Sequence, residues 1–363
     1  MNSIKNFLSS RLGIILAGSI IGIIAVLLQY YGNPANMGIC MACFVRDITG
    51  ATGFHRAAVV QYLRPEIPAL ILGAFLSSVV FGEFKSRSGS SPILRFVLGA
   101  CAMIGALVFL GCPWRAFLRL AGGDLNALYG IAGLVVGVFV GTLFIRNGYS
   151  LGATQKASKA SGLVMPLIAL FLLALRFIYP PIEGADKSGL LFYSLKGPGA
   201  SFAPLAYSVC AGILIGFICQ RSRFCTMGAV RDLLMFRQVH LLSALLSFLV
   251  VAFVANNLLG LFHMGFDGQP VAHTASLWNF LGMVGSGLAF ALAGGCPGRQ
   301  LVLSAEGDSD AGVFVLGMFA GAAISHNMMF ASSPAGVGAY GVAATVCVIA
   351  IGLVIGLTNI RKI

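Results

Sequence analysis

The chain has 363 residues, of which 58% are hydrophobic and 9% are charged, and its mean hydropathy is +0.94. In soluble domains about a quarter of the residues are charged, so this composition excludes an ordinary soluble protein. The net charge of +12 does not indicate a nucleic-acid partner, because the basic residues are spread between the apolar runs instead of forming one basic face. We therefore expect an all-α integral membrane protein.

Ten apolar runs approach the length of about 20 residues that a membrane-spanning helix needs. In chain order they are 12–30, 66–82, 93–112, 125–147, 161–180, 203–220, 241–263, 278–296, 311–331 and 337–359. The run 66–82 is short, and 161–180 is set off by a basic linker. No small-residue cleavage site follows the first run, which favours a span over a signal peptide.

Lysines and arginines orient the chain, since they favour cytoplasmic loops. With both termini inside, most of the 23 basic residues are cytoplasmic, among them Lys5, Arg361 and Lys362. We predict a multi-pass protein of the inner (cytoplasmic) membrane.

Two motifs occur twice in the chain. "CMACFVRD" at 40–47 matches "CTMGAVRD" at 225–232, and "GCPWRAFLRLAGGD" at 111–124 matches "GCPGRQLVLSAEGD" at 295–308. Weaker echoes pair "AGSIIG" at 17–22 with "AGILIG" at 211–216, and Gly137 and Gly141 with Gly317 and Gly321. The near-constant separation predicts two homologous halves, 1–180 and 201–363, joined by a polar linker at 181–200.

Each half contains five predicted spans, and an odd number inverts the second half relative to the first. Transporters with inverted repeats bind their substrates between the repeats, often at broken helices. We therefore expect two inverted five-helix repeats with short re-entrant or broken helices.

The Gly-Cys-Pro motifs predict a broken helix in each half. Proline suits the first position of a helix, so short helices should begin at Pro113 and Pro297, with Cys112 and Cys296 as N-caps. Such helix ends attract anions and lower thiol pKa values. Arg115 and Arg299 add fixed charge in the first turn. An interfacial helix with arginines reaching lipid headgroups is the alternative, but it does not need a matched cysteine.

Cys40 and Cys225 precede the Arg-Asp pairs Arg46–Asp47 and Arg231–Asp232, which we place on short re-entrant helices. Charges at membrane depth pair with one another or line a polar cavity. Each aspartate can neutralise an arginine, or each arginine can attract an anion, and both roles stay open.

The pair Cys40–Cys43 is a C-x-x-C, a spacing found in redox dithiols. Its second cysteine corresponds to Gly228 in the other half, so the repeated element is a single thiol. Cys101, Cys210 and Cys347 lie within apolar runs and are expected to pack. The five histidines show no metal-ligand spacing with the cysteines, and we find no nucleotide-binding glycine loop, so no metal or cofactor is expected.

The motifs "GCPWR", "GGCPGR" and "SRFCTMGAVRD" resemble the YeeE/YedE family of sulfur-compound transporters over essentially the whole chain. The resemblance implies an hourglass-shaped inverted repeat whose cysteines pass thiosulfate along by hydrogen bonds to sulfur. The matching positions are Cys112, Cys225 and Cys296, and Cys40 joins them by internal symmetry. The stretch "GICMACFVRDITGATGFHRAAVVQYLRPEI" is more similar to the branch assigned to selenium transport.

We therefore predict an importer of a small selenium- or sulfur-containing anion, and not an enzyme. Its partners would be that anion, the lipid bilayer and a cytoplasmic sulfur- or selenium-carrier protein. The alternative is a membrane thiol oxidoreductase or sulfurtransferase that uses Cys40 and Cys43. The predicted substrate-binding residues are Cys40, Cys112, Cys225, Cys296, Arg46, Arg115, Arg231 and Arg299.

Overall fold

The computed structural model describes residues 10–360, so Lys5, Arg361 and Lys362 lie outside the described part of the chain. The described residues are mainly α-helical, which confirms the predicted all-α class. In chain order the helices are α2 (Arg11–Tyr30), α3 (Met41–Ala51), α4 (Glu66–Val80), α5 (Pro92–Phe109), α6 (Pro113–Ala121), α7 (Asn126–Arg146), α8 (Lys159–Ile178), α9 (Leu205–Ser222), α10 (Thr226–Phe236), α11 (His240–Leu258), α12 (Ser276–Ala293), α13 (Pro297–Ala305), α14 (Ser309–Asn327) and α15 (Gly341–Thr358).

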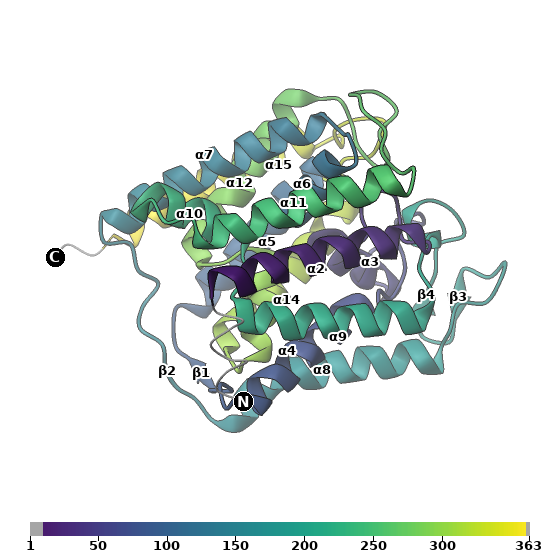
Figure 1. The fold of residues 1–363 in the computed structure, drawn as a ribbon. Coiled ribbons are helices and arrows are strands. Elements are labelled where there is room, and N and C mark those ends of the chain that lie inside the picture. Colours follow the sequence, from purple (N-terminus) through teal and green to yellow (C-terminus); the bar gives the residue numbers. More distant parts are fainter. Residues whose placement is uncertain (1–9, 361–363) are drawn as a thin grey trace.

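Two short antiparallel strand pairs lie at opposite sides of the view in Figure 1. Strand β1 (Arg87–Ser88) pairs with β2 (Gln155–Lys156), and β3 (Lys187–Ser188) pairs with β4 (Leu191–Phe192). The second pair lies in the predicted linker, together with the single-turn 3₁₀ helix η1 (Pro198–Ala200).

Nine stretches of the described chain are long and apolar enough to cross a membrane. Three of them join a long helix to a short one: Pro92–Ala121, Leu205–Phe236 and Ser276–Ala305. Nine of the ten predicted spans therefore have a helix of spanning length.

The predicted span at 66–82 is the exception. Helix α4 has only 15 residues, which gives about 22 Å at 1.5 Å per residue, less than the bilayer core of about 30 Å. Pro65 stands at its N-cap, and Gly82 follows its end with a positive φ of 66°. These two residues bound the helix, so the apolar run is longer than the helix it forms.

When α2–α8 are aligned in chain order with α9–α15, a contact between two helices recurs between their two equivalents. Helix α7 packs along α12 and α5 along α14, while α2 packs along α11 and α4 along α9. Figure 1 shows α2 lying between α11 and α9. The last helices differ, since α8 packs on α4 whereas α15 packs on α12 and α5.

The repeated glycines lie where these helices touch. A Cβ at Gly18 or Gly22 of α2 would meet the α11 backbone at 2.0 Å or 2.7 Å, and a Cβ at Gly216 of α9 would meet the α4 backbone at 2.0 Å. Small residues let helix backbones approach closely in membranes, where van der Waals packing drives association. The echo between "AGSIIG" and "AGILIG" is therefore a packing motif used twice.

Helices α5 and α12 form a buried antiparallel pair at the centre of the fold. The Ser286 hydroxyl of α12 donates to the Ala102 carbonyl of α5 at 3.0 Å, and Gly105 lies against Gly282. Each helix leads directly into one of the Gly-Cys-Pro motifs. The pair thereby positions the two motifs relative to each other.

Candidate functional site: two buried thiol pairs

The four predicted cysteines form two pairs. The Sγ atoms of Cys40 and Cys112 are 3.8 Å apart, and those of Cys225 and Cys296 are 3.6 Å apart. Each pair joins one cysteine of the Arg-Asp motif to one of the Gly-Cys-Pro motif in the same half of the chain. All four are free thiols and buried.

Every one of these cysteines occupies a helix N-cap. Cys40 caps α3 and Cys225 caps α10, and their sulfur atoms accept hydrogen bonds from the backbone N–H groups of Cys43 at 3.3 Å and Gly228 at 3.2 Å. Cys112 and Cys296 stand at the caps of α6 and α13, which begin with proline. The predicted breaks at Pro113 and Pro297 are therefore observed.

Two helix N-termini converge on each proline-linked sulfur. The Cys112 sulfur lies near the backbone N–H groups of Ala42 in α3 and Arg115 in α6. The Cys296 sulfur lies near those of Thr226 in α10 and Arg299 in α13. Orphan N–H groups and the positive ends of helix dipoles favour negative charge. Each thiol pair therefore lies in an environment suited to an anion.

Arg115 adds a buried positive charge beside the first pair. Its guanidinium donates to the backbone carbonyls of Asn36, Pro270 and Val271, each at 3.2 Å, and of Leu110, and it lies 4.0 Å from the Cys43 sulfur. Among residues 10–360 it forms no ion pair with a carboxylate. Its charge also acts on the Cys40 and Cys43 thiols. The carbonyls hold the side chain in place but leave its charge uncompensated.

The Arg46–Asp47 motif forms a buried cluster with a third residue, Arg64. Arg46 donates to Asp47 Oδ1 at 2.6 Å and Arg64 donates to Asp47 Oδ2 at 2.8 Å. One aspartate thus serves two arginines, and the cluster keeps a net charge of +1. Both roles left open for Arg46 are compatible with this arrangement, because the ion pair does not use up the positive charge.

The second half has a similar excess of positive charge, in a more exposed position. Glu306 accepts from Arg299 at 3.1 Å and Arg223 at 3.3 Å, and Glu83 accepts from Arg221 at 2.8 Å and Arg223 at 3.1 Å. Among the described residues of this network, three arginines share two carboxylates.

Arg231 stands apart from that network. It pairs with Asp232 at 2.8 Å and is about one-third exposed. Its symmetry counterpart, Arg46, is buried. The structure therefore brings Arg115 close to the thiols and leaves Arg231 nearer the surface.

Near the thiols, sequence reasoning considered Cys43 only as part of a redox dithiol, and it missed Cys219. The Cys43 thiol lies 3.8 Å from the Leu110 carbonyl and also contacts Cys40. Cys219, on α9, is buried and close enough to Cys296 and Arg299 to interact with their charges. No repeat marks Cys219, so only the packing of α9 could reveal it.

Burial also affects the thiols at the start of α3, a helix of 11 residues that is not one of the candidate spans. Burial raises the pKa of the Cys40 thiol to about 12 and that of Cys43 well above its usual value. Removing a group from water penalises its charged form. Both thiols are therefore neutral S–H groups near pH 7 in this conformation.

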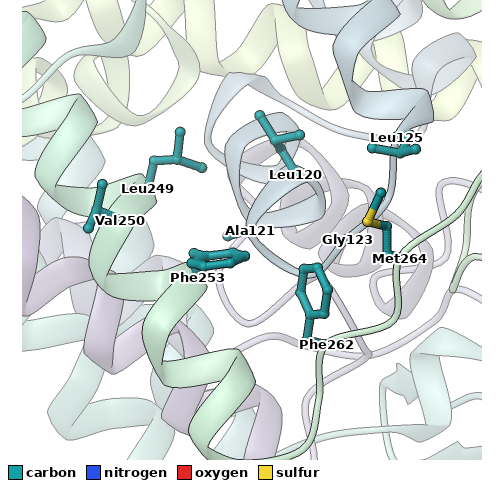
Figure 2. Close-up of a pocket in the computed structure, with 9 residues that line it drawn as sticks. All are labelled: Leu120, Ala121, Gly123, Leu125, Leu249, Val250, Phe253, Phe262 and Met264. Atoms are coloured by element: carbon teal, nitrogen blue, oxygen red, sulfur yellow. The ribbon is translucent and has the colours of Figure 1, made fainter.

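The thiol pairs are closed off from the surface. Cys40, Cys112 and Cys296 are fully buried, and Cys225 is 6% exposed. An apolar hollow of about 350 Å³ lies elsewhere, between α11 and the end of α6, where Phe253, Phe262 and Leu120 converge (Figure 2). None of the site cysteines lines it, so it is not part of the thiol site.

Among residues 10–360, no three His, Cys, Asp or Glu side chains group in a way that could hold a metal ion.

No curated protein matches the chain. Residues 221–358, however, match the family model described as sulphur transport. The matched segment contains Cys225, Cys296, Arg231 and Arg299, and it begins just before the second thiol pair.

Proposed function

We propose that this multi-pass membrane protein imports a small sulfur- or selenium-containing anion along a path lined by Cys40, Cys112, Cys225 and Cys296. The observation that carries the proposal is the pair of matched thiol sites, each at two converging helix N-termini. The sulphur-transport match of residues 221–358 supports a sulfur compound as the cargo.

The proposed path runs between two inverted repeats, residues 1–180 and 201–363 with a linker at 181–200. The matched helix pairings support this division. Helices that would be equivalent to each other run antiparallel, as inversion requires. Tyr31 at the end of α2 stacks on Tyr207 at the start of α9 with 4.7 Å between ring centroids, and Ala102 of α5 faces Ser286 of α12.

A soft anion suits the chemistry of each site. Backbone N–H groups and uncompensated arginine charge attract a negative group, while a polarizable thiol donates weakly to a polarizable sulfur or selenium atom. Thiosulfate and selenium anions share this chemistry, and both are candidates. We further propose cytoplasmic termini, the inner membrane as the location, and a cytoplasmic sulfur- or selenium-carrier protein as the receiving partner.

Transport fits the site better than thiol redox chemistry at Cys40 and Cys43. That pair occurs in one half only, since Gly228 replaces Cys43 in the other, whereas the Cys40–Cys112 arrangement recurs as Cys225–Cys296. An oxidoreductase also needs its dithiol to meet a partner, and both thiols are fully buried. We therefore infer that the protein is not an enzyme.

Uptake by proteoliposomes tests the proposal. Vesicles containing the protein should accumulate labelled thiosulfate, selenite or selenosulfate, and Cys112→Ala or Cys296→Ala should reduce uptake more than tenfold while leaving insertion intact. Cys101→Ala is the matched control, because Cys101 is also buried but lies within α5 away from both pairs. Wild-type vesicles that accumulate none of the three anions would contradict transport. Full uptake by both site variants would show that the two thiols only pack in the interior.

A further inference from the structure

Trp114 connects the two thiol pairs. It lies in the first turn of α6, two residues after Cys112, and is 1% exposed. Its ring meets Phe224, the residue before Cys225, edge-on at 5.0 Å between centroids. The same ring lies against Gly298, two residues after Cys296, where an added Cβ would be 3.2 Å from the indole Nε1. A residue of the first half therefore lies against both segments that carry the second pair.

Gly298 is the repeat counterpart of Trp114, as "GCPWR" aligns with "GCPGR". The contact explains the mismatch. The two positions face each other across the interface between the halves, and the indole already occupies the space that a side chain at Gly298 would need. Only one of the two positions can carry the ring, so the arrangement is necessarily asymmetric there.

Two buried hydrogen-bond donors at this place have no partner among the described residues. They are the indole Nε1–H of Trp114 and the hydroxyl of Thr226. Thr226 is fully buried, and its hydroxyl lies beside the Cys296 sulfur without a hydrogen bond of normal geometry to it. An unpaired buried donor costs roughly 1–3 kcal/mol. Both donors are next to segments that carry the second thiol pair, where a ligand oxygen could complete their hydrogen bonding.

The donors have no counterparts at the first pair. In the repeat alignment, Thr226 of the second half corresponds to Met41 of the first half, whose side chain has no hydrogen-bond donor. Trp114 of the first half corresponds to Gly298 of the second half, which has no side chain. The two sites therefore differ in chemistry although both hold two thiols. The first offers thiols, backbone N–H groups and Arg115, whereas the second also offers a hydroxyl and an indole N–H. Hard oxygen acceptors suit these additional donors better than sulfur does.

We infer that Trp114 and Thr226 form an oxygen-binding subsite at the second thiol pair and select anions that carry oxygen atoms together with sulfur or selenium. This inference rests on the proposed transport function and assigns a binding site to the oxygen atoms of its candidate anions. The thiols of Cys225 and Cys296 contact the soft atom, while the indole N–H and the hydroxyl bind the oxygens.

The chain has only two tryptophans, so direct binding can be observed by fluorescence. Trp278→Phe leaves Trp114 as the sole indole, and Trp278 lies on α12 away from the site. Titration of this variant with sodium thiosulfate or selenite should shift Trp114 emission saturably, whereas sodium chloride should not. Emission that responds equally to chloride, or to none of the anions, would overturn the inference.

Transport kinetics provide the second test. Trp114→Phe keeps an aromatic ring against Phe224 but removes the N–H, and Thr226→Val keeps the shape but removes the hydroxyl. Each should raise the KM for thiosulfate about tenfold to hundredfold, the range for a hydrogen bond lost to a charged group. Trp278→Phe, the matched tryptophan control, should transport like the wild type.

These outcomes separate the two proposals. If the wild type transports and both Trp114→Phe and Thr226→Val retain its KM, the subsite is refuted while the transport function stands. If the wild type transports nothing, the proposed function fails first. Should Trp114→Phe fail to insert, the KM of Thr226→Val alone decides between an oxygen-binding and a purely structural role.

Discussion

At the residue scale, each cysteine of the two pairs is a helix cap, and the first pair also lies near the fixed positive charge of Arg115. The N-cap positions of Cys112 and Cys296 were predictable, because proline after cysteine restricts the local backbone to a helix start. Those of Cys40 and Cys225, which no proline follows, were not predicted. The groups that contact the charged side chains were not predictable. Arg64 is 17 residues from Asp47 and Arg115 binds carbonyls of the 270–271 loop, and these contacts depend on how distant segments pack.

The same residue-scale chemistry predicts how the thiols act during transport. An anion at the site disfavours a second negative charge on the adjacent sulfur, because two like charges about 4 Å apart repel by roughly 4 kcal/mol at an effective dielectric constant near 20. The occupied site should therefore hold neutral S–H donors.

We accordingly expect transport without a covalent intermediate. Mass spectrometry of protein quenched during thiosulfate or selenosulfate turnover should find Cys112 and Cys296 unmodified, with the exposed Cys210 reporting the background of nonspecific modification. A persulfide or selenyl-sulfide adduct on Cys112 or Cys296 that forms and discharges at the transport rate would contradict this relay.

At the scale of the elements, the sequence predicted the position of every long helix and of the two helix breaks at the Gly-Cys-Pro motifs, because apolar run length and Cys-Pro breaks are local signals. It overestimated the length of α4, because the apolar run continues past the end of the helix. It could not predict that Trp114 meets Gly298. Alignment of the repeats places a large residue opposite a small one, but their contact depends on how α6 and α13 approach each other.

Helix contacts through glycine lead to a prediction about assembly. A Cβ at Gly137 of α7 would lie 2.2 Å from the Val284 carbonyl oxygen, and one at its repeat counterpart Gly317 would lie 2.1 Å from the Phe96 carbonyl oxygen. Gly137→Leu and Gly317→Leu should each destabilise the protein by about 3 kcal/mol or more, since backbone atoms cannot move aside as side chains do.

The measurement is thermal unfolding in detergent, followed by size-exclusion chromatography. Val136→Leu is the matched control, because Val136 adjoins Gly137 but is 40% exposed toward lipid. If Gly137→Leu unfolds at the temperature of Val136→Leu, the close α7–α12 contact is not needed for assembly.

At the scale of the whole molecule, both thiol pairs are buried at once, so an anion can pass only if the surrounding elements move. A buried connection between the halves offers a constraint on such movement. Glu66 of α4 accepts from Asn33 and from Ser208 of α9, each at 2.8 Å. These contacts join the end of α2, the start of α4 and the start of α9 into one polar cluster. We expect this cluster to move as a unit.

The inverted arrangement makes a prediction about sidedness that does not depend on the buried thiols. Phe54 follows α3 and is 66% exposed, and Gln238 follows the equivalent helix α10 and is exposed. If the halves are inverted, these positions lie on opposite sides of the membrane, with Phe54 outside and Gln238 in the cytoplasm, as the distribution of basic residues predicts.

Labelling with a membrane-impermeant maleimide tests this sidedness. The exposed native thiols are first removed by Cys210→Ser and Cys347→Ser. Phe54→Cys or Gln238→Cys is then added, and each variant is labelled in intact and in permeabilised cells. The cysteine at position 54 should react in intact cells, and the one at 238 only after permeabilisation. Reaction of both from the same side would exclude inversion, and with it a path that presents equivalent thiol pairs to the two faces of the membrane.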